Sequence, residues 1–145
     1  MIKNKKKQEF NEFVLISACK GDKYDNARLL GLESDLIESN FVYKQVNGCY
    51  NGIEEVSFYV ELDSNNDIHE QIDILDNLAY KYKQESILHV NKNRDARLLY
   101  INIPRVEHIG TFKQVPKCFA LQHVAYTYDI ANNGYYVTTK TPIKG

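Results

Sequence analysis

The chain has 145 residues, enough for one domain with a substantial core but too few for two domains of the usual size. Hydrophobic residues make up 43% and charged residues 26%, as in a typical globular chain, and the formal net charge of -1 excludes a broad cationic face for nucleic acid. The longest apolar run, Phe13 to Cys19, is too short to cross a bilayer and lacks a signal-peptide cleavage pattern, so we expect a cytoplasmic protein without nucleic-acid or membrane partners.

The N-terminal residues predict a tail followed directly by a strand. Residues 1–12 are rich in lysine and predict a flexible basic tail, so that residues 13–145 form the single domain. The continuous apolar run from Phe13 to Ala18, bounded by a polar turn, predicts a buried central strand.

Two amphipathic helices are predicted from apolar residues at helical spacing. The first covers 25–39, with Asp22 or Asp25 as its N-cap, and the second follows the N-cap residue Asp67. The apolar positions of the first helix are Leu29, Leu32, Leu36 and Ile37. Those of the second helix are Ile68, Ile72, Leu75, Leu78, Ala79 and Tyr82.

Further strands are predicted at 41–46, 55–62 and 86–90, which gives the order β-α-β-β-α-β. This order predicts an α+β fold of the ferredoxin-like class, an antiparallel sheet with two helices on one face. After residue 90 the pattern predicts additional C-terminal strands. The last two are predicted to form a hairpin with Asn133 and Gly134 as its turn.

The sequence does not carry the spacing of a metal site or of a nucleophilic triad. The four histidines are far apart and the three cysteines include no close pair, so no metal is expected. Cys49, beside Tyr50, is the one cysteine that suggests a nucleophile, and no sequence pattern identifies its base. Gly-rich phosphate-binding loops are absent from the sequence.

Two acidic sites remain as candidates. Tyr50 precedes the pair Glu54 and Glu55, and adjacent residues on a strand point to opposite faces, so one of the two glutamates is expected to face inward. Gln84 and Glu85 lie between the second helix and the strand at 86–90. We expect the third strand to begin at the end of the sheet where the fourth strand finishes, so the two sites need not meet within one subunit but could meet across an oligomer interface.

The sequence resembles the bacteriophage S-adenosylmethionine lyases, formerly called S-adenosylmethionine hydrolases, from about Phe13 to Val137. The resemblance rests on "FVLISACKGD", "NGCYNGIEE", "QESILHV" and "GTFKQVPKCFALQ". It implies cleavage of S-adenosylmethionine to 5′-methylthioadenosine and homoserine lactone. In this reaction the carboxylate of the substrate attacks its own γ-carbon, with no cofactor and no metal.

The resemblance also implies roles for the candidate residues. Glu55 and Tyr50 are expected to be catalytic, with Glu55 holding the cationic substrate and Tyr50 lying near its sulfonium. Glu85, Gln84 and Glu54 are expected to bind substrate, although Glu54 is also compatible with a position facing away from the site.

Relatives of this kind assemble as homotrimers with active sites between subunits, and they deplete S-adenosylmethionine in the host cell, which counteracts restriction. Two other functions stay open from the sequence. One is a non-catalytic anti-defence protein that sequesters an adenine-nucleotide-type ligand, and the other is an inhibitor that acts by binding another protein.

Overall fold

The structure is a computed structural model, and it describes residues 11–144. The elements in chain order are β1 (Phe13–Ile16), α1 (Asp25–Glu38), β2 (Val42–Tyr50), β3 (Ile53–Glu61), α2 (Ile68–Lys81), β4 (Ser86–Val90), β5 (Asp95–Tyr100), β6 (Val106–Val115), α3 (Lys117–Ala120), β7 (Ala125–Asp129) and β8 (Gly134–Thr138). No helix in this described part is long and apolar enough to cross a membrane.

The strands form one closed antiparallel barrel, in the order β1-β3-β2-β7-β8-β6-β5-β4 and back to β1. The prediction of an open ferredoxin-like sheet is therefore wrong. The strands β4, β1, β3 and β2 are neighbours, but β5 pairs with β4 and β7 pairs with β2, and β6 and β8 join the two sides. Closing the sheet removes the two edges whose backbone groups an open sheet leaves unpaired.

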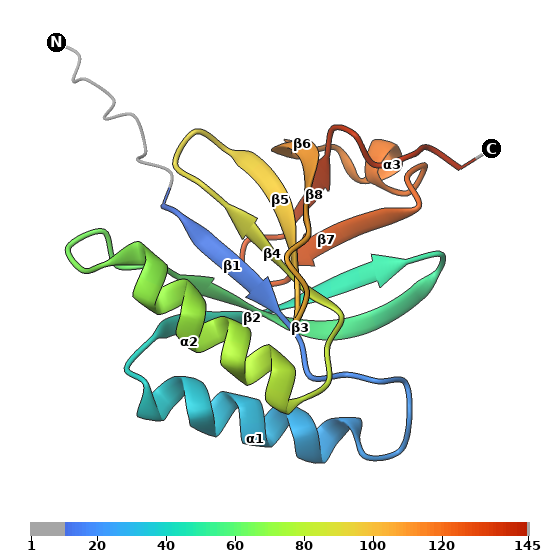
Figure 1. The fold of residues 1–145 in the computed structure, drawn as a ribbon. Coiled ribbons are helices and arrows are strands. Elements are labelled where there is room, and N and C mark those ends of the chain that lie inside the picture. The colour runs from blue at the N-terminus through green and yellow to red at the C-terminus, as the bar shows by residue number, and fades with distance from the viewer. Residues whose placement is uncertain (1–10, 145) are drawn as a thin grey trace, which may run out of the picture.

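The helices α1 and α2 lie side by side against the outside of this barrel (Figure 1). Their apolar stripes bury Leu32 and Leu36 of α1 and Leu75 and Ala79 of α2. These side chains pack in one cluster with the residues of β1 and β3 that face the helices, such as Val60. The predicted stripe of α2 is confirmed, because each of its six members belongs to this cluster or packs against it.

One helix cap is as predicted and the other is not. Asp67 caps α2, since its carboxylate accepts from the backbone N–H groups of His69 and Glu70. The N-cap of α1 is Tyr24, whose side chain makes no capping hydrogen bond. Asp25 instead accepts from the backbone N–H of Lys20 at 2.7 Å and from that of Gly21 at 3.0 Å, so it shapes the loop after β1.

The hairpin of β2 and β3 is longer than its sequence pattern indicates. Only Asn51 and Gly52 form the turn, with φ values of 52° and 83°, a left-handed conformation that glycine adopts at no steric cost. The strands therefore include the "NGCY" segment and both glutamates of the pair. In the C-terminal hairpin, by contrast, Gly134 already belongs to β8, pairs with Asp129 and is not part of the turn.

The long strand β6 has no counterpart among the sequence predictions. Five of its ten residues are exposed and only two are buried, so it shows little alternation of apolar and polar positions. The strand bends at Gly110, whose φ is 93°, and a Cβ at this position would lie 2.9 Å from the backbone nitrogen of Lys140. Phe112 and Val115 are buried, and Pro116 is the N-cap of α3. The segment "GTFKQVPK" thus contains the part of β6 that pairs with β8 and closes the barrel.

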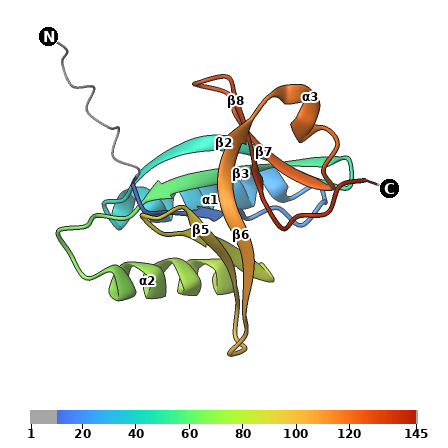
Figure 2. The same cartoon turned by 90° about the horizontal axis from the view of Figure 1, so that it is seen from above.

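The inside of the barrel holds a second cluster that includes Phe13, Val90, Ala96 and Phe112. Seen from above, β2 and β3 form one wall and β5 and β6 the opposite wall (Figure 2). We call the end of the barrel at which β1 begins the start rim, and the end at which β1 finishes the end rim. The antiparallel pairing places the β7–β8 turn at the start rim and the β2–β3 turn at the end rim.

Candidate functional sites at the two rims of the barrel

Glu55 lies at the end rim, beside the loop that follows β1. The buried hydroxyl of Ser17 donates to the backbone carbonyl of Val56 at 2.7 Å and also interacts with the Glu55 carboxylate. Although Glu55 as a residue is exposed, partial burial of its carboxylate raises its pKa, Asp25 raises it further, and Ser17 lowers it. No cationic side chain contributes to this shift, so the negative charge is available to a bound cation.

Tyr50 shares its strand face with Glu55. Tyr50 pairs with Ile53 and Gly48 pairs with Glu55, so Tyr50 and Glu55 are diagonal neighbours, which typically lie about 7–8 Å apart. Tyr50 is 64% exposed, and Gly48 places no side chain opposite Glu55. The rim is therefore open at this point and combines an accessible aromatic ring with a carboxylate.

Glu54 points to the other face of β3. It pairs with Cys49, and its charge acts on the hydroxyl of Tyr126. A hydrogen bond with Cys49, burial and nearby charges raise the pKa of Tyr126 to about 12. The two adjacent glutamates are thus on opposite faces, and Glu54 is separated from the group around Ser17.

Gln84 joins the end rim, contrary to expectation. Its side-chain amide donates to the carbonyl of Cys19 at 3.0 Å, which fixes the loop after β1. Because β3 and β4 both pair antiparallel with β1, both strands begin at the same rim, and the prediction that the two acidic sites lie at opposite ends of the sheet is wrong. Glu85 is exposed, and its backbone carbonyl accepts from the N–H of Ile101 at 2.9 Å.

The start rim carries a pocket of 440 Å³ inside the barrel, which we call the barrel pocket. Six neighbouring strands line it, and Asn11, Arg94 and Asn132 surround its mouth. The strand residues that line it are Leu15, Lys44, Val46, Tyr59, Phe112, Gln114, Thr127, Asp129 and Tyr136. This volume falls in the range of small-molecule sites.

An ion pair between a partly exposed lysine and a buried aspartate forms one wall of the barrel pocket. The ammonium of Lys44 lies 2.7 Å from Oδ2 of Asp129 and 4.9 Å from the centroid of the Tyr59 ring. Burial opposes ionisation of Asp129, but hydrogen bonds from Lys44 and Asn132 outweigh it and lower the pKa of this carboxyl. Burial, together with Glu61, Tyr136 and Asp129, raises the pKa of Tyr59 to about 12, so its hydroxyl keeps its proton at neutral pH.

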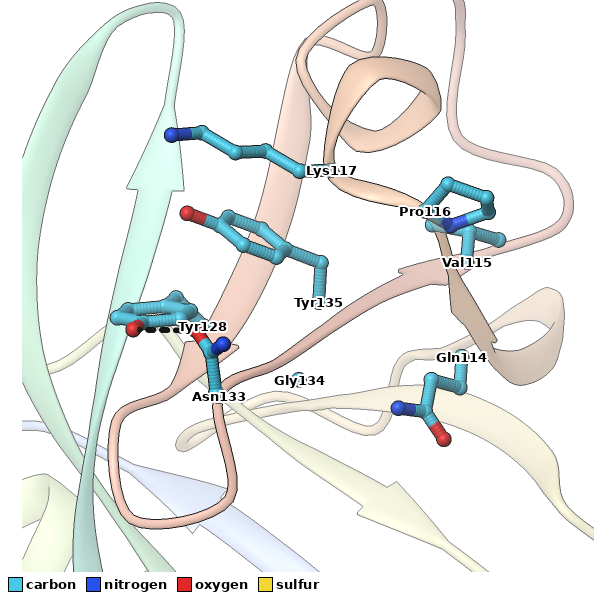
Figure 3. A pocket seen from close by; sticks show the side chains of 8 residues that line it. All are labelled: Gln114, Val115, Pro116, Lys117, Tyr128, Asn133, Gly134 and Tyr135. Atoms are coloured by element: carbon cyan, nitrogen blue, oxygen red, sulfur yellow. Dashed lines mark hydrogen bonds between the residues drawn. The ribbon is translucent and has the colours of Figure 1, made fainter.

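A wider hollow of 740 Å³ lies outside the barrel, next to α3 (Figure 3). The rings of Tyr128 and Tyr135 stack there with centroids 4.6 Å apart, and the Tyr128 hydroxyl donates to Asn133. The side chains of Lys117 and Tyr135 extend in the same direction above Tyr128 (Figure 3). None of the residues predicted to act on substrate lines this hollow.

His89 on β4 is buried, at 4% exposed, and its ring contacts two charged side chains. Its Nε2 lies 2.6 Å from a carboxylate oxygen of Glu12, and its Nδ1 accepts from Nε of Arg97 at 2.9 Å. Both ring nitrogens are therefore occupied, as in a structural histidine. Within residues 11–144 no three His, Cys, Asp or Glu side chains are grouped so that they could hold a metal ion.

The barrel pocket and its ion pair were not predicted from the sequence. Lys44 and Asp129 are 85 residues apart, and each lies in a segment that was predicted only as a strand. The one available signal is a charged residue at an alternating position between apolar neighbours, as Lys44 is between Val42 and Val46.

A lined pocket of this size inside a closed barrel is typical of proteins that bind small molecules. The model of the S-adenosylmethionine lyase family matches residues 14–139, and the chain belongs to that family. This match confirms the family resemblance seen in the sequence. No curated protein matches the chain.

Proposed function

We propose that the protein cleaves S-adenosylmethionine to 5′-methylthioadenosine and L-homoserine lactone. The observation that carries this proposal is the match to the S-adenosylmethionine lyase family over residues 14–139. The open end rim supports it, because Glu55 and Tyr50 on one strand face offer a carboxylate and an aromatic ring to a cationic substrate.

The proposed reaction breaks one bond and forms one. A carboxylate oxygen of the substrate attacks the γ-carbon of its own methionine chain and forms the C–O bond of the lactone. The C–S bond breaks, and its electron pair stays on sulfur, which becomes a neutral thioether. Charge disappears during the step, so the protein has no new ion to stabilise and needs neither a cofactor nor a metal. Its task is to hold the chain in the ring-closing conformation.

The proposed roles follow this requirement. Glu55 holds the substrate through its ammonium group, away from sulfur, because a carboxylate against the sulfonium stabilises the ground state most. Tyr50 presents its ring near the sulfonium. Gln84 keeps the loop after β1 in place, and Glu85 is proposed to bind the ribose or the amino-acid end. Of the five candidate residues, Glu54 has the least support as a substrate ligand, because it lies on the strand face opposite to Glu55.

By analogy with the family, we propose that the chain assembles as a homotrimer with active sites between subunits. In a trimer the exposed end rim faces a neighbouring subunit, which supplies the wall that one chain lacks. The proposed biological role is depletion of S-adenosylmethionine in the host cytoplasm during phage infection, which deprives restriction-modification systems of their methyl donor.

The test is mass spectrometry of purified protein incubated with S-adenosylmethionine, run beside Glu55→Gln and Glu54→Gln. These two variants remove the same charge from adjacent residues on opposite faces of one strand. We expect methylthioadenosine from the wild type. Glu55→Gln should lower kcat/KM by about tenfold to a hundredfold, the value of one charged hydrogen bond, and Glu54→Gln should leave it nearly unchanged. Recovery of intact substrate from wild-type protein contradicts the enzyme and favours sequestration.

A further inference from the structure

A pocket with charged walls lies on the outside of the barrel, and we call it the outer pocket. It has a volume of 490 Å³ and is lined mainly by residues of β4, β5 and β6. His89 and Arg97 are cross-strand partners, and so are Arg97 and His108. The adjacent residues Val90 and Ala96 belong to the cluster inside the barrel, so these three side chains point outward. The barrel wall therefore separates the outer pocket from the barrel pocket.

A buried histidine holds the guanidinium group of Arg97 at the outer pocket. The Nε of Arg97 donates to Nδ1 of His89 at 2.9 Å, and Nε2 of His89 lies 2.6 Å from the carboxylate of Glu12. The two Nη atoms of Arg97 donate to no residue in the described part of the chain, and they remain accessible to solvent. Because Nε is occupied, the free edge of the guanidinium is its pair of Nη atoms, which matches the two oxygens of a carboxylate.

Two further charged side chains line the outer pocket without a partner. Lys140 lies beside β6, where its backbone N–H donates to the carbonyl of Ile109 at 3.1 Å. Asp95 lies opposite Thr111 at the start of β5. Among residues 11–144, neither of these side chains nor Arg97 forms an ion pair with a group of opposite charge. The outer pocket thus combines two unpaired cations and one unpaired carboxylate.

This arrangement of charges matches a zwitterion. A simple anion meets the like charge of Asp95, and a simple cation meets two positive side chains. A molecule that carries a carboxylate and an ammonium group gives all three unpaired charges a partner. Asp95 and Arg97 are two residues apart on one strand face, about 7 Å, so their side chains can reach two groups attached to one carbon. The accessible hydroxyl of Thr111 and side-chain amide of Asn91 add further hydrogen-bonding groups.

We propose that the outer pocket binds a free α-amino acid, with its carboxylate on Arg97 and Lys140 and its ammonium group on Asp95. The volume of the pocket leaves room for the side chain of the amino acid as well. This assignment follows from the charges of the lining and does not rest on the proposed reaction. The site is also separate from Glu55, which lies at the end rim, so binding to it can be measured without turnover.

The experiment is an NMR titration of the intact, ¹⁵N-labelled protein with glycine, the smallest α-amino acid. Two analogues each remove one charge: glycolate has a hydroxyl in place of the ammonium group, and glycinamide has an amide in place of the carboxylate. The backbone signals of Gly110 and Thr111, in the lining, report binding. We expect saturable shifts with glycine in the millimolar range, and at least about tenfold weaker binding of each analogue, since each loses a charged hydrogen bond.

Three variants assign the two ends of the ligand. Asp95→Asn should weaken the binding of glycine by about threefold to tenfold and should not weaken that of glycolate. Arg97→Gln and Lys140→Met should weaken both ligands, and Lys140→Met keeps the test available if the loss of the bond to His89 unfolds Arg97→Gln. Lys92→Met, an exposed residue of the β4–β5 turn outside the pocket, is the matched control and should bind as the wild type does. A thermal melt checks that each variant is folded.

Every other outcome overturns the proposal. Glycolate or inorganic phosphate that binds as tightly as glycine, and more tightly in Asp95→Asn, identifies an anion site. Glycinamide that binds as tightly as glycine identifies a cation site. The absence of saturable shifts at Gly110 and Thr111, or shifts that Asp95→Asn and Lys140→Met both retain at wild-type strength, shows that the outer pocket does not bind an amino acid. None of these results depends on whether the protein cleaves S-adenosylmethionine.

Discussion

The side-chain amide of Gln84 donates to the backbone carbonyl of Cys19 at 3.0 Å, across 65 residues of sequence. This hydrogen bond joins the segment that leads into β4 to the loop that leaves β1. The same loop donates two backbone N–H groups to Asp25, the first residue of α1, whose charge raises the pKa of Glu55 after the larger effect of burial. One amide therefore helps to fix the surroundings of the proposed catalytic carboxylate.

Replacing Gln84 by Leu keeps the size of the side chain and removes the donor. We expect a loss of about 1 kcal/mol in the free energy of unfolding, since a partly buried carbonyl loses its partner. We also expect KM for S-adenosylmethionine to rise. Urea denaturation and steady-state kinetics measure the two effects. Glu85→Gln is the control for stability, because the backbone carbonyl of Glu85, rather than its side chain, makes the hydrogen bond to Ile101. A Gln84→Leu variant as stable as the wild type contradicts this role.

Replacing Ser17 by Ala should shift the pH dependence of activity. Ser17 lowers the pKa of the Glu55 carboxyl against the raising effects of burial and Asp25. Without the hydroxyl that pKa rises, so a higher pH is needed to ionise Glu55. The acid limb of the profile of kcat/KM against pH should move to higher pH, with little change on its plateau. Ser34→Ala, on the exposed side of α1, is the control and should leave the profile in place. If the acid limb of the kcat/KM profile is unchanged in Ser17→Ala, Glu55 is not the group whose ionisation sets that limb.

His89 should make stability depend on pH below neutrality. Burial lowers the pKa of His89, an effect that Arg97 reinforces and Glu12 opposes. The unfolded chain therefore takes up a proton near pH 6.5 while the folded protein does not. Stability should fall as pH drops below about 6.5 and level off once the folded histidine is also protonated. His89→Gln removes this contribution, whereas Glu12→Gln should enlarge it. Urea melts between pH 5 and 8 measure the difference, and parallel curves for wild type and His89→Gln contradict the assignment.

The packing of α2 on the barrel should dominate its stability. Leu75 is fully buried between α2 and the strands, and Leu75→Ala should cost about 2–5 kcal/mol through lost contacts and a cavity. Ile74, the preceding residue, is 41% exposed, and Ile74→Ala should cost much less. The comparison uses midpoints of urea denaturation with an unchanged m value. Equal losses at the two positions mean that α2 does not pack as described.

Local patterns predicted the helices well and the closure of the sheet poorly. The stripe of α2 and the cap at Asp67 depend on residues within one turn of each other, so the sequence displays them directly. Barrel closure depends on β6, which shows little alternation of apolar and polar positions, and on pairing between strands far apart in the chain. The order of elements up to β4 is therefore common to an open sheet and to this barrel.

In the candidate sites, too, relations between residues close in the sequence could be predicted, whereas relations that depend on strand pairing could not. The opposite faces of Glu54 and Glu55 follow from strand alternation, and the structure places them so. The grouping of Gln84 with Glu55 requires the strand directions, which were assigned wrongly from the sequence. The Lys44–Asp129 pair depends on β7 lying next to β2, a neighbour relation that only the closed barrel creates.

The most direct test of the proposed reaction is its course in water enriched in ¹⁸O, followed by mass spectrometry from the earliest times. Attack by the carboxylate of the substrate predicts unlabelled homoserine lactone together with methylthioadenosine, and any homoserine formed later should carry ¹⁸O in its carboxyl group. Homoserine with ¹⁸O in its γ-hydroxyl, present from the first time point, would show that water attacks the γ-carbon and would contradict the lyase mechanism.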